Sequence, residues 1–392
     1  MKNKLLFAGL VTAVCAGSTV NADETLHLSV VSGLPANHTA IKIFRERFQS
    51  EVSRRLTEAE VSNVVWDETH AGTLAHFGGV LEAVEDDLAV FGIISVNQET
   101  RRLPLQNMTY QAPFSTESCE VVGTGYHAAH ETVVGMVAPI TVARQTYLAA
   151  IASDSYNFMA VQKIRNAADV RGIPIGISER LDGWLSGVDG APVRLPADVL
   201  NARLAEGVLI GVLAPNTEMR RLGFKEHADH YTRTGFGAQV PYIVTVNSQA
   251  LRALPGVVRD AVMDTAKEFV PAAAQDYCAA GAKALEALKV QGVQTAKLLK
   301  SRRIQWADTL DPLAQIWAAK NDQAGRPGSA AIAAYMDHLT HSGVKLIRDW
   351  RIPAPRGAIA KLSLPAKKVS RTSKAARPEK VSHKSSKPVA RH

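Results

Sequence analysis

The stretch LHLSVVSGLPANH, residues 26–38, decides the fold of this 392-residue chain. Its first six residues predict a short buried strand, and Ser32-Gly-Leu-Pro35 ends that strand. A helix is predicted to begin near His38. Apolar residues recur along it at three- and four-residue steps and would share one buried face: Ile41, Phe44, Phe48, Val52 and Leu56. A strand that leads directly into an amphipathic helix is typical of α/β proteins.

The same alternation of strands and helices continues along the chain. Strands are predicted at 61–66, 88–94, 173–177, 208–213 and 242–246, and helices at 77–84, 195–204, 255–288 and 313–341. This order predicts an α/β protein with mainly parallel, doubly wound sheets, and the pattern restarts after about residue 150. Pro271 lies inside the long helix and predicts either a kink or two helices end to end. Gly325-Arg-Pro-Gly328 interrupts the last helical region.

The charge of the chain is unevenly distributed. The sequence has 45 Lys and Arg against 37 Asp and Glu, a net charge of +8. Residues 356–392 hold eleven of these bases and one acid, so the body of the chain is mildly acidic. A core that binds nucleic acid is therefore disfavoured. The tail from 353 to 392 is predicted to be disordered, because it has hardly any aromatic residues to offset its ordering entropy.

The first 22 residues have the features of an export signal. Lys2 and Lys4 precede an apolar stretch at 5–16, and small residues lead to a cleavage site after Ala22. We therefore expect a periplasmic protein. Cys119 and Cys278 remain in the mature chain, and the sequence leaves open whether they form a disulfide or are two buried thiols.

No catalytic motif is present. The sequence lacks the phosphate-binding loop, the dinucleotide fingerprint, the Gly-x-Ser-x-Gly elbow and the zinc-protease pattern, so we expect no enzyme, no catalytic residue and no cofactor. The pairs His127/His130 and His227/His230 have a spacing that could place two metal ligands on one helix face. A tight site needs three or four ligands, so we interpret these histidines as solvated surface residues and expect no metal site.

Several segments resemble the extracytoplasmic solute receptors, the substrate-binding subunits, of tripartite ATP-independent periplasmic (TRAP) transporters. The resemblance rests on LSVVSGLP with Asn37-His38, on VRGIPIG at 170–176, and on FGAQVPYIVTVN at 236–247 followed by LRALP at 251–255. It implies two α/β lobes joined by crossing strands and a long hinge-spanning helix. Lobe I would comprise 23–152 and 241–280, and lobe II 153–240 and 281–352. It also implies a small-molecule ligand between the lobes and membrane permease subunits as partners.

The predicted pocket departs from the pattern of that family. Gly176 stands where the family carries an arginine for an organic acid, a second family arginine falls near Tyr156-Asn157, and a polar stretch is replaced by Ile210–Pro215. Arg180 or Arg194 could supply a displaced arginine, or each could lie on the surface. Tyr156 and Trp184 would suit an aromatic ligand or could be core packing. The candidate ligand-binding residues are Asn37, His38, Ser95, Asn97, Tyr156, Asn157, Gly176, Arg180 and Arg194.

Two functions are compatible with these features. The first is an exported receptor with a diverged pocket, which delivers a small organic compound, an organic acid among the options, to a TRAP-type permease. The alternative is a receptor-derived interaction protein that has lost ligand binding and acts through its surface or its basic tail. That tail either lies along an anionic envelope surface or only aids solubility. No nucleic-acid partner is expected.

Overall fold

The computed structural model describes residues 25–61 and 63–351. Two separate mixed sheets form its framework. Sheet A has the strand order β2 (Val64–Thr69), β1 (Leu26–Ser32), β3 (Phe91–Ser95), β10 (Gln239–Asn247) and β4 (Gln145–Ser153). Sheet B has the order β11 (Gln294–Lys297), β9 (His230–Arg233), β5 (Tyr156–Ala160), β8 (Gly211–Pro215), β6 (Pro174–Ile177) and β7 (Ala191–Arg194).

Sheet A is parallel along one side, whereas sheet B is parallel at both edges, where β11 pairs with β9 and where β6 pairs with its two neighbours. β1 is parallel to β2 and β3, and β6 is parallel to β7 and β8. β10 runs antiparallel to β3 and β4, and β5 runs antiparallel to β8 and β9. The prediction of parallel strands is confirmed for β1 to β3 and for β6 to β8. The antiparallel pairs involve β4, β5, β9 and β10, the strands that lead from one sheet into the other.

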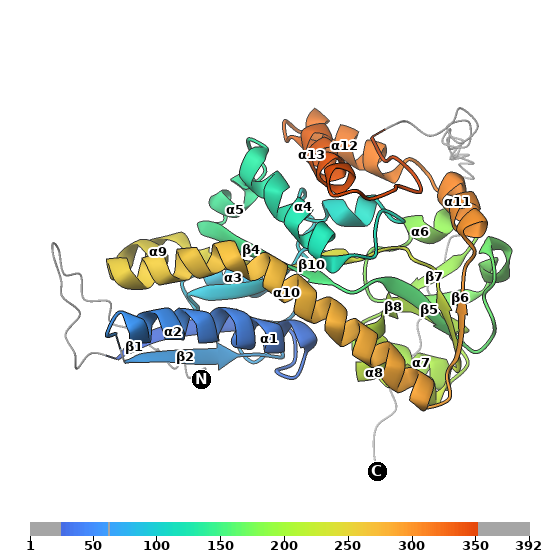
Figure 1. Cartoon of the computed structure of the whole chain (residues 1–392), viewed down its shortest axis with the longest axis horizontal. Coiled ribbons are helices and arrows are strands. Elements are labelled where there is room, and N and C mark those ends of the chain that lie inside the picture. The colour runs from blue at the N-terminus through green and yellow to red at the C-terminus, as the bar shows by residue number, and fades with distance from the viewer. Residues whose placement is uncertain (1–24, 62, 352–392) are drawn as a thin grey trace, which may run out of the picture.

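Two chain crossings and one long helix connect the sheets. β4 leads into β5, and β9 leads into β10, so each crossing leaves one sheet and enters the other. Helix α10 (Gly256–Val290) contacts β4 and α4 on one side and α8 on the other, and it spans the length of the molecule in Figure 1. This is the two-lobe architecture that the sequence predicts.

Helix α10 is continuous across Pro271, which excludes two helices end to end, the second of the two alternatives that the sequence predicts. Proline removes the amide that would bond to the carbonyl of Lys267. Both residues are exposed, so solvent can satisfy that carbonyl. The helix therefore tolerates proline at this position because the residue lies on its exposed face.

The remaining helices cover the sheets. They are α1 (Thr39–Ile43), η1 (Phe44–Gln49), α2 (Ser50–Glu58), α3 (Val80–Glu85), η2 (Met108–Gln111), α4 (Cys119–Thr132), α5 (Ala138–Val142), η3 (Ala167–Val170), α6 (Gly183–Ser186), η4 (Ala197–Val199), α7 (Leu200–Ala205), α8 (Asn216–Arg221), η5 (Phe224–Glu226), α9 (Ser248–Ala253), α11 (Lys300–Thr309), α12 (Leu313–Gln323) and α13 (Gly328–His341). α12 and α13 replace the interrupted helix 313–341, and α13 packs on α4.

The first helical segment confirms the predicted core face. Ile41, Phe44, Phe48, Val52 and Leu56 are all buried, and Phe44 stacks on Phe48 with ring centroids 5.0 Å apart. His38 caps this helix, because its Nδ1 accepts a hydrogen bond from the amide of Ala40 at 3.1 Å.

Cys119 and Cys278 form a disulfide, which decides the alternative that the sequence left open. It links α4 to α10, and the Cα atoms are 5.8 Å apart. The predicted signal peptide 1–22 and the predicted tail 353–392 lie outside the described residues, and the lobe boundaries stay a prediction.

Candidate ligand-binding site

The carboxyl ends of parallel strands from both sheets meet at one place. His38 follows β1 and Asn97 follows β3, whereas Glu179 follows β6 and Glu218 lies in α8, directly after β8. Side chains at such strand ends are the usual source of binding groups in open α/β sheets. His38 Nε2 lies 3.2 Å from Glu218 Oε1, so sheet A and sheet B are in polar contact here.

Glu218 is the best-satisfied acid of this group. Its carboxylate accepts hydrogen bonds from Arg221 Nε at 2.9 and 3.2 Å, besides the contact with His38. Burial would raise the pKa of Glu218, but the hydrogen bonds from His38 and Arg221 outweigh it and lower the pKa to about 2. Glu218 is therefore ionised at neutral pH, and the Arg221 guanidinium forms an ion pair with it.

Glu179 lies among hydroxyl groups. Tyr156 donates its hydroxyl to Glu179 Oε2, and the Tyr110 hydroxyl lies 3.0 Å from that of Tyr156. Burial raises the pKa of Glu179 to about 7, and the negative charge of Glu218 adds to this, although the two phenols and Asn97 act in the opposite direction. Burial therefore favours the neutral form of this carboxyl more than water does.

Asn97 is next to Glu179 and is 4% exposed. Its side-chain amide lies close enough to the Glu179 carboxyl to act on it as a donor, whereas its Oδ1 has no hydrogen-bond partner within the described part of the chain. Buried amide groups are nearly always paired in folded proteins. Asn97 thus offers an unpaired acceptor close to the Glu179 carboxyl.

Asp154 lies in the first crossing, between β4 and β5, and its side chain is hydrogen-bonded to the start of α8. It is 3% exposed, and it accepts hydrogen bonds from the Asn216 amide and the Thr217 hydroxyl, both at 2.7 Å. Burial raises its pKa to about 7, although those hydrogen bonds oppose the shift. A Cβ at Gly281 would come within 2.5 Å of the Asp154 side chain, so glycine allows α10 to approach the crossing. Asp154 therefore positions the helix that carries Glu218.

Asn157 holds the two crossings together. Its Oδ1 accepts from the amides of Thr234 and Gly235 at 3.0 and 3.3 Å. Its Nδ2 donates to the Ser155 carbonyl and to Asn216 Oδ1 at 2.9 and 3.2 Å. These bonds use both donors and two acceptor positions, so Asn157 is a positioning residue for the crossing strands.

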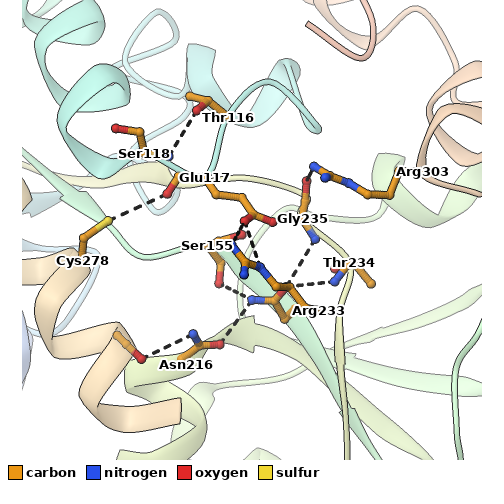
Figure 2. Close-up of polar contacts among 12 residues, drawn as sticks. Thr116, Glu117, Ser118, Ser155, Asn216, Arg233, Thr234, Gly235, Cys278 and Arg303 are labelled. Atoms are coloured by element: carbon orange, nitrogen blue, oxygen red, sulfur yellow. Dashed lines mark hydrogen bonds and ion pairs between the residues drawn. The ribbon is translucent and has the colours of Figure 1, made fainter. Parts of the chain in front are cut away.

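Charged side chains flank the second crossing, as Figure 2 shows. Arg233 Nε donates to Glu117 Oε2 at 2.9 Å, and Arg303 donates to the Gly235 carbonyl at 3.1 Å. Gly237 has φ +109°, and a Cβ there would lie 2.7 Å from the Thr116 carbonyl oxygen. The backbone between the sheets therefore requires glycine at this position.

The remaining candidates predicted from the sequence differ in their exposure. Asn37 and Arg180 are exposed, Ser95 is buried, and Arg194 forms an ion pair with Asp182. Arg180 and Arg194 therefore lie on the surface, which is one of the two alternatives that the sequence left open for them.

Gly176 faces an apolar core. A Cβ on it would lie 2.6 Å from Leu209 and 2.8 Å from Leu200. Trp184 is also core: its Nε1 donates to the Tyr110 carbonyl at 2.9 Å, and its ring stacks on Phe236. Of the predicted residues, the structure thus brings His38, Asn97 and Tyr156 into the group at the strand ends.

Sequence reasoning missed Glu179, Glu218, Arg221, Tyr110 and Asp154. Glu179 lies two residues after β6, as Asn97 lies two residues after β3, so position after a strand was a usable signal. Tyr110 lies in η2 and carries no comparable signal.

No metal centre is apparent in residues 25–61 and 63–351, where no three His, Cys, Asp or Glu side chains are arranged to hold an ion. The interpretation of His130 as a solvated residue is wrong. It is buried, stacks on Tyr147 with ring centroids 4.4 Å apart, and contacts the Tyr126 carbonyl through Nδ1 at 2.9 Å. Burial lowers its pKa to about 3.

Residues 30–321 match the family model DctP, described as bacterial extracellular solute-binding protein, family 7. The chain belongs to this family. It is a family of transport receptors and not a class of enzymes, and it comprises the TRAP receptors that the sequence resembles. Within the described residues, no helix is both long enough and apolar enough to cross a membrane.

Solved members of the TRAP type share the fold. A periplasmic solute-binding protein from Desulfovibrio salexigens is 21% identical, with 82% of this chain and 98% of that chain covered and a TM-score of 0.71. A marine metagenome protein solved with 3-hydroxybenzoate is 17% identical, with coverages of 81% and 98% and a TM-score of 0.71. A Bordetella bronchiseptica protein with bound mandelate is 18% identical, with coverages of 81% and 99% and a TM-score of 0.67.

Proposed function

We propose that this protein is an exported, periplasmic receptor that binds one small organic compound between its two lobes and delivers it to the membrane subunits of a TRAP-type permease. Family membership and the two-lobe fold support this proposal. Solved neighbours with bound hydroxybenzoate or mandelate support a ligand of about that size.

The observation that carries the proposal is the contact between the strand ends of the two sheets. His38 on one side and Glu218 on the other come within 3.2 Å, while the two crossings and α10 are the connections that can bend. Closure of two lobes around such connections buries a small molecule and gathers polar groups from both sides. Selection by closure requires no bond to be made or broken in the ligand.

Thermal unfolding of the purified protein tests ligand binding. A ligand that binds only the folded state stabilises it by RT ln(1 + [L]/Kd), which is about 2.7 kcal/mol at a concentration of 100 Kd. We expect a clear rise in Tm with one chemical class in a panel of small acids, amines and polyols. Uptake of that compound by cells that carry the gene should stop when the gene is deleted.

A flat thermal response across the whole panel would contradict the proposal. Stabilisation by a ligand whose uptake persists after deletion would refute the transport role and leave ligand binding intact. Small-angle scattering provides an independent measurement, because a bound ligand should shift the population toward the compact arrangement of the two lobes.

A further inference from the structure

A groove with a volume of about 480 Å³ lies where three segments that are distant in the sequence meet. The loop before α4 contributes Ser115, the segment after α13 contributes Lys345 and Ile347, and the segment 297–303 contributes the rest of the lining. The lining holds no acid and four cationic side chains, which are those of Lys297, Lys300, Arg303 and Lys345. We call these four residues the basic groove.

The cations of the basic groove form no ion pair within residues 25–61 and 63–351. The acid whose charge acts on Arg303 is Glu117, and this acid is already bound by Arg233 at 2.9 Å, as Figure 2 shows. Arg303 donates to the Gly235 carbonyl, but its buried Nε has no hydrogen-bond partner in the part of the chain that the structure describes. Burial lowers the pKa of Arg303 in spite of Glu117, so a negative group in the groove would stabilise this guanidinium.

Helix α11 begins at the basic groove. Its first residue is Lys300, and the preceding Leu299 provides no side-chain hydrogen bond to the free amides of the first turn. The positive end of the helix dipole therefore adds to the charge of the cations. Leu299 is 70% exposed and lies in the sequence between Lys297 and Lys300. The groove thus combines positive charge with an exposed apolar side chain.

The basic tail follows the described residues close to this groove. Trp350 donates through Nε1 to the Pro113 carbonyl at 2.8 Å, and Pro113 is two residues from Ser115 in the groove lining. Residues 356–392 hold eleven bases and one acid. That segment is not a suitable occupant of the groove, because like charges repel. Groove and tail instead attract the same kind of partner, an extended negative surface.

A surface of anionic phospholipid has the properties that this region requires. Its phosphate groups repeat across the surface, so the basic groove and the tail can be neutralised at the same time. Its acyl boundary accepts an exposed leucine, while the long aliphatic stems of neighbouring lysines keep their charges at the level of the headgroups. A free phosphate offers no apolar contact, and an acidic peptide in the groove would leave the charge of the tail without a partner.

We infer that the basic groove is a docking surface for a membrane of anionic phospholipids. Lys297, Lys300, Arg303 and Lys345 bind lipid phosphate groups, and Leu299 enters the boundary between headgroups and acyl chains. This role goes beyond the proposed receptor function, since it does not involve the ligand that lies between the lobes. Docking of this kind would keep the receptor close to the membrane subunits to which it delivers that ligand.

Co-sedimentation with lipid vesicles tests the inference on the chain from Asp23 to His392. We expect binding to vesicles of phosphatidylcholine mixed with phosphatidylglycerol and none to vesicles of phosphatidylcholine alone. Equal binding to the two kinds of vesicle, or binding to neither, would overturn the inference. Inorganic phosphate should not displace the protein from anionic vesicles when the ionic strength is matched with chloride. Displacement by phosphate would assign the groove to a free anion instead of a lipid surface.

Charge variants locate the docking surface while the tail stays intact. The triple variant Lys297→Gln, Lys300→Gln and Lys345→Gln should bind anionic vesicles about 10- to 100-fold more weakly than the original protein. The matched control removes three positive charges from exposed positions on α1, α9 and α10, by Lys42→Gln, Arg252→Gln and Lys283→Gln. This control should stay within about threefold of the original protein, because the charges of the groove remain. Equal affinity of the two triple variants, with both proteins folded by circular dichroism, would show that the groove is not the docking surface.

Discussion

The buried carboxyl of Asp154 predicts a specific dependence of stability on pH. The pKa of this group rises from 3.8 to about 7 because of burial. Between these values the folded protein keeps a proton that the unfolded chain has released. The folded state therefore binds more protons, and stability falls as pH rises through this range. The gap corresponds to about 4 kcal/mol, an upper value for a single group.

The substitution Asp154→Asn replaces this carboxyl by an amide that does not titrate. The amide oxygen can still accept from the Asn216 amide, which lies 2.7 Å from the present carboxyl, and Thr217 can accept from the new amide group. We expect the free energy of unfolding of the variant, relative to the original protein, to rise by up to about 4 kcal/mol between pH 4 and pH 8.

Urea unfolding at several pH values between 4 and 8.5 measures this difference. Other groups contribute to the pH dependence in this range, among them His130, because burial lowers its pKa to about 3 whereas a histidine in the unfolded chain titrates near about 6.5. These contributions are equal in both proteins and cancel. Asp198→Asn, at an exposed position, is the control and should give a flat difference. A difference for Asp154→Asn that stays within about 1 kcal/mol over the whole range would refute the reasoning.

Three further predictions concern the disulfide, the inter-sheet contact and the core of sheet B. Replacing both Cys119 and Cys278 by alanine should lower the free energy of unfolding by about 2–5 kcal/mol, and an unchanged urea midpoint would contradict the disulfide. His38→Ala removes the contact with Glu218, so the protein without ligand should have a larger radius of gyration by small-angle scattering. An identical radius would show that this contact does not hold the two sheets together. Gly176→Arg should destabilise the protein by about 1–3 kcal/mol or more, because the new side chain would enter the space of two buried leucines. An unchanged Tm of this variant would show that Gly176 does not face the apolar core.

Local patterns were sufficient to predict much of the fold. The helix expected at 255–288 is α10 at Gly256–Val290, and the strand expected at 242–246 is the second half of β10. These elements were predictable because burial of one face imposes a period on neighbouring residues. The strands β9 and β11 were not predicted, because four residues are too few to establish a period, whereas the equally short β6 was marked by the turn that ends at Gly172.

The candidate site was predictable only in part. His38 and Asn97 were found because they lie next to predicted strands, and Tyr156 was found because the family resemblance places an arginine near it. Arg180 and Arg194 were proposed for their chemistry, but Arg180 is exposed and Arg194 pairs with Asp182, because the orientation of a side chain after a strand depends on what packs against it. Asn157 was proposed as a ligand-binding residue and instead holds the crossings, since its bonding partners lie almost 80 positions away.

The amino-acid sequence alone determines the α/β class, the face of each long helix that is buried and the lack of familiar catalytic motifs, because these properties depend on neighbouring residues. Only the tertiary structure decides that His38 meets Glu218 and that Glu179 lies between a tyrosine and Asn97. His38 and Glu218 are 180 positions apart and Asn97 and Glu179 are 82 apart, and their approach depends on strand order and on two crossings between the sheets. The charge of the site is therefore a property of the folded chain.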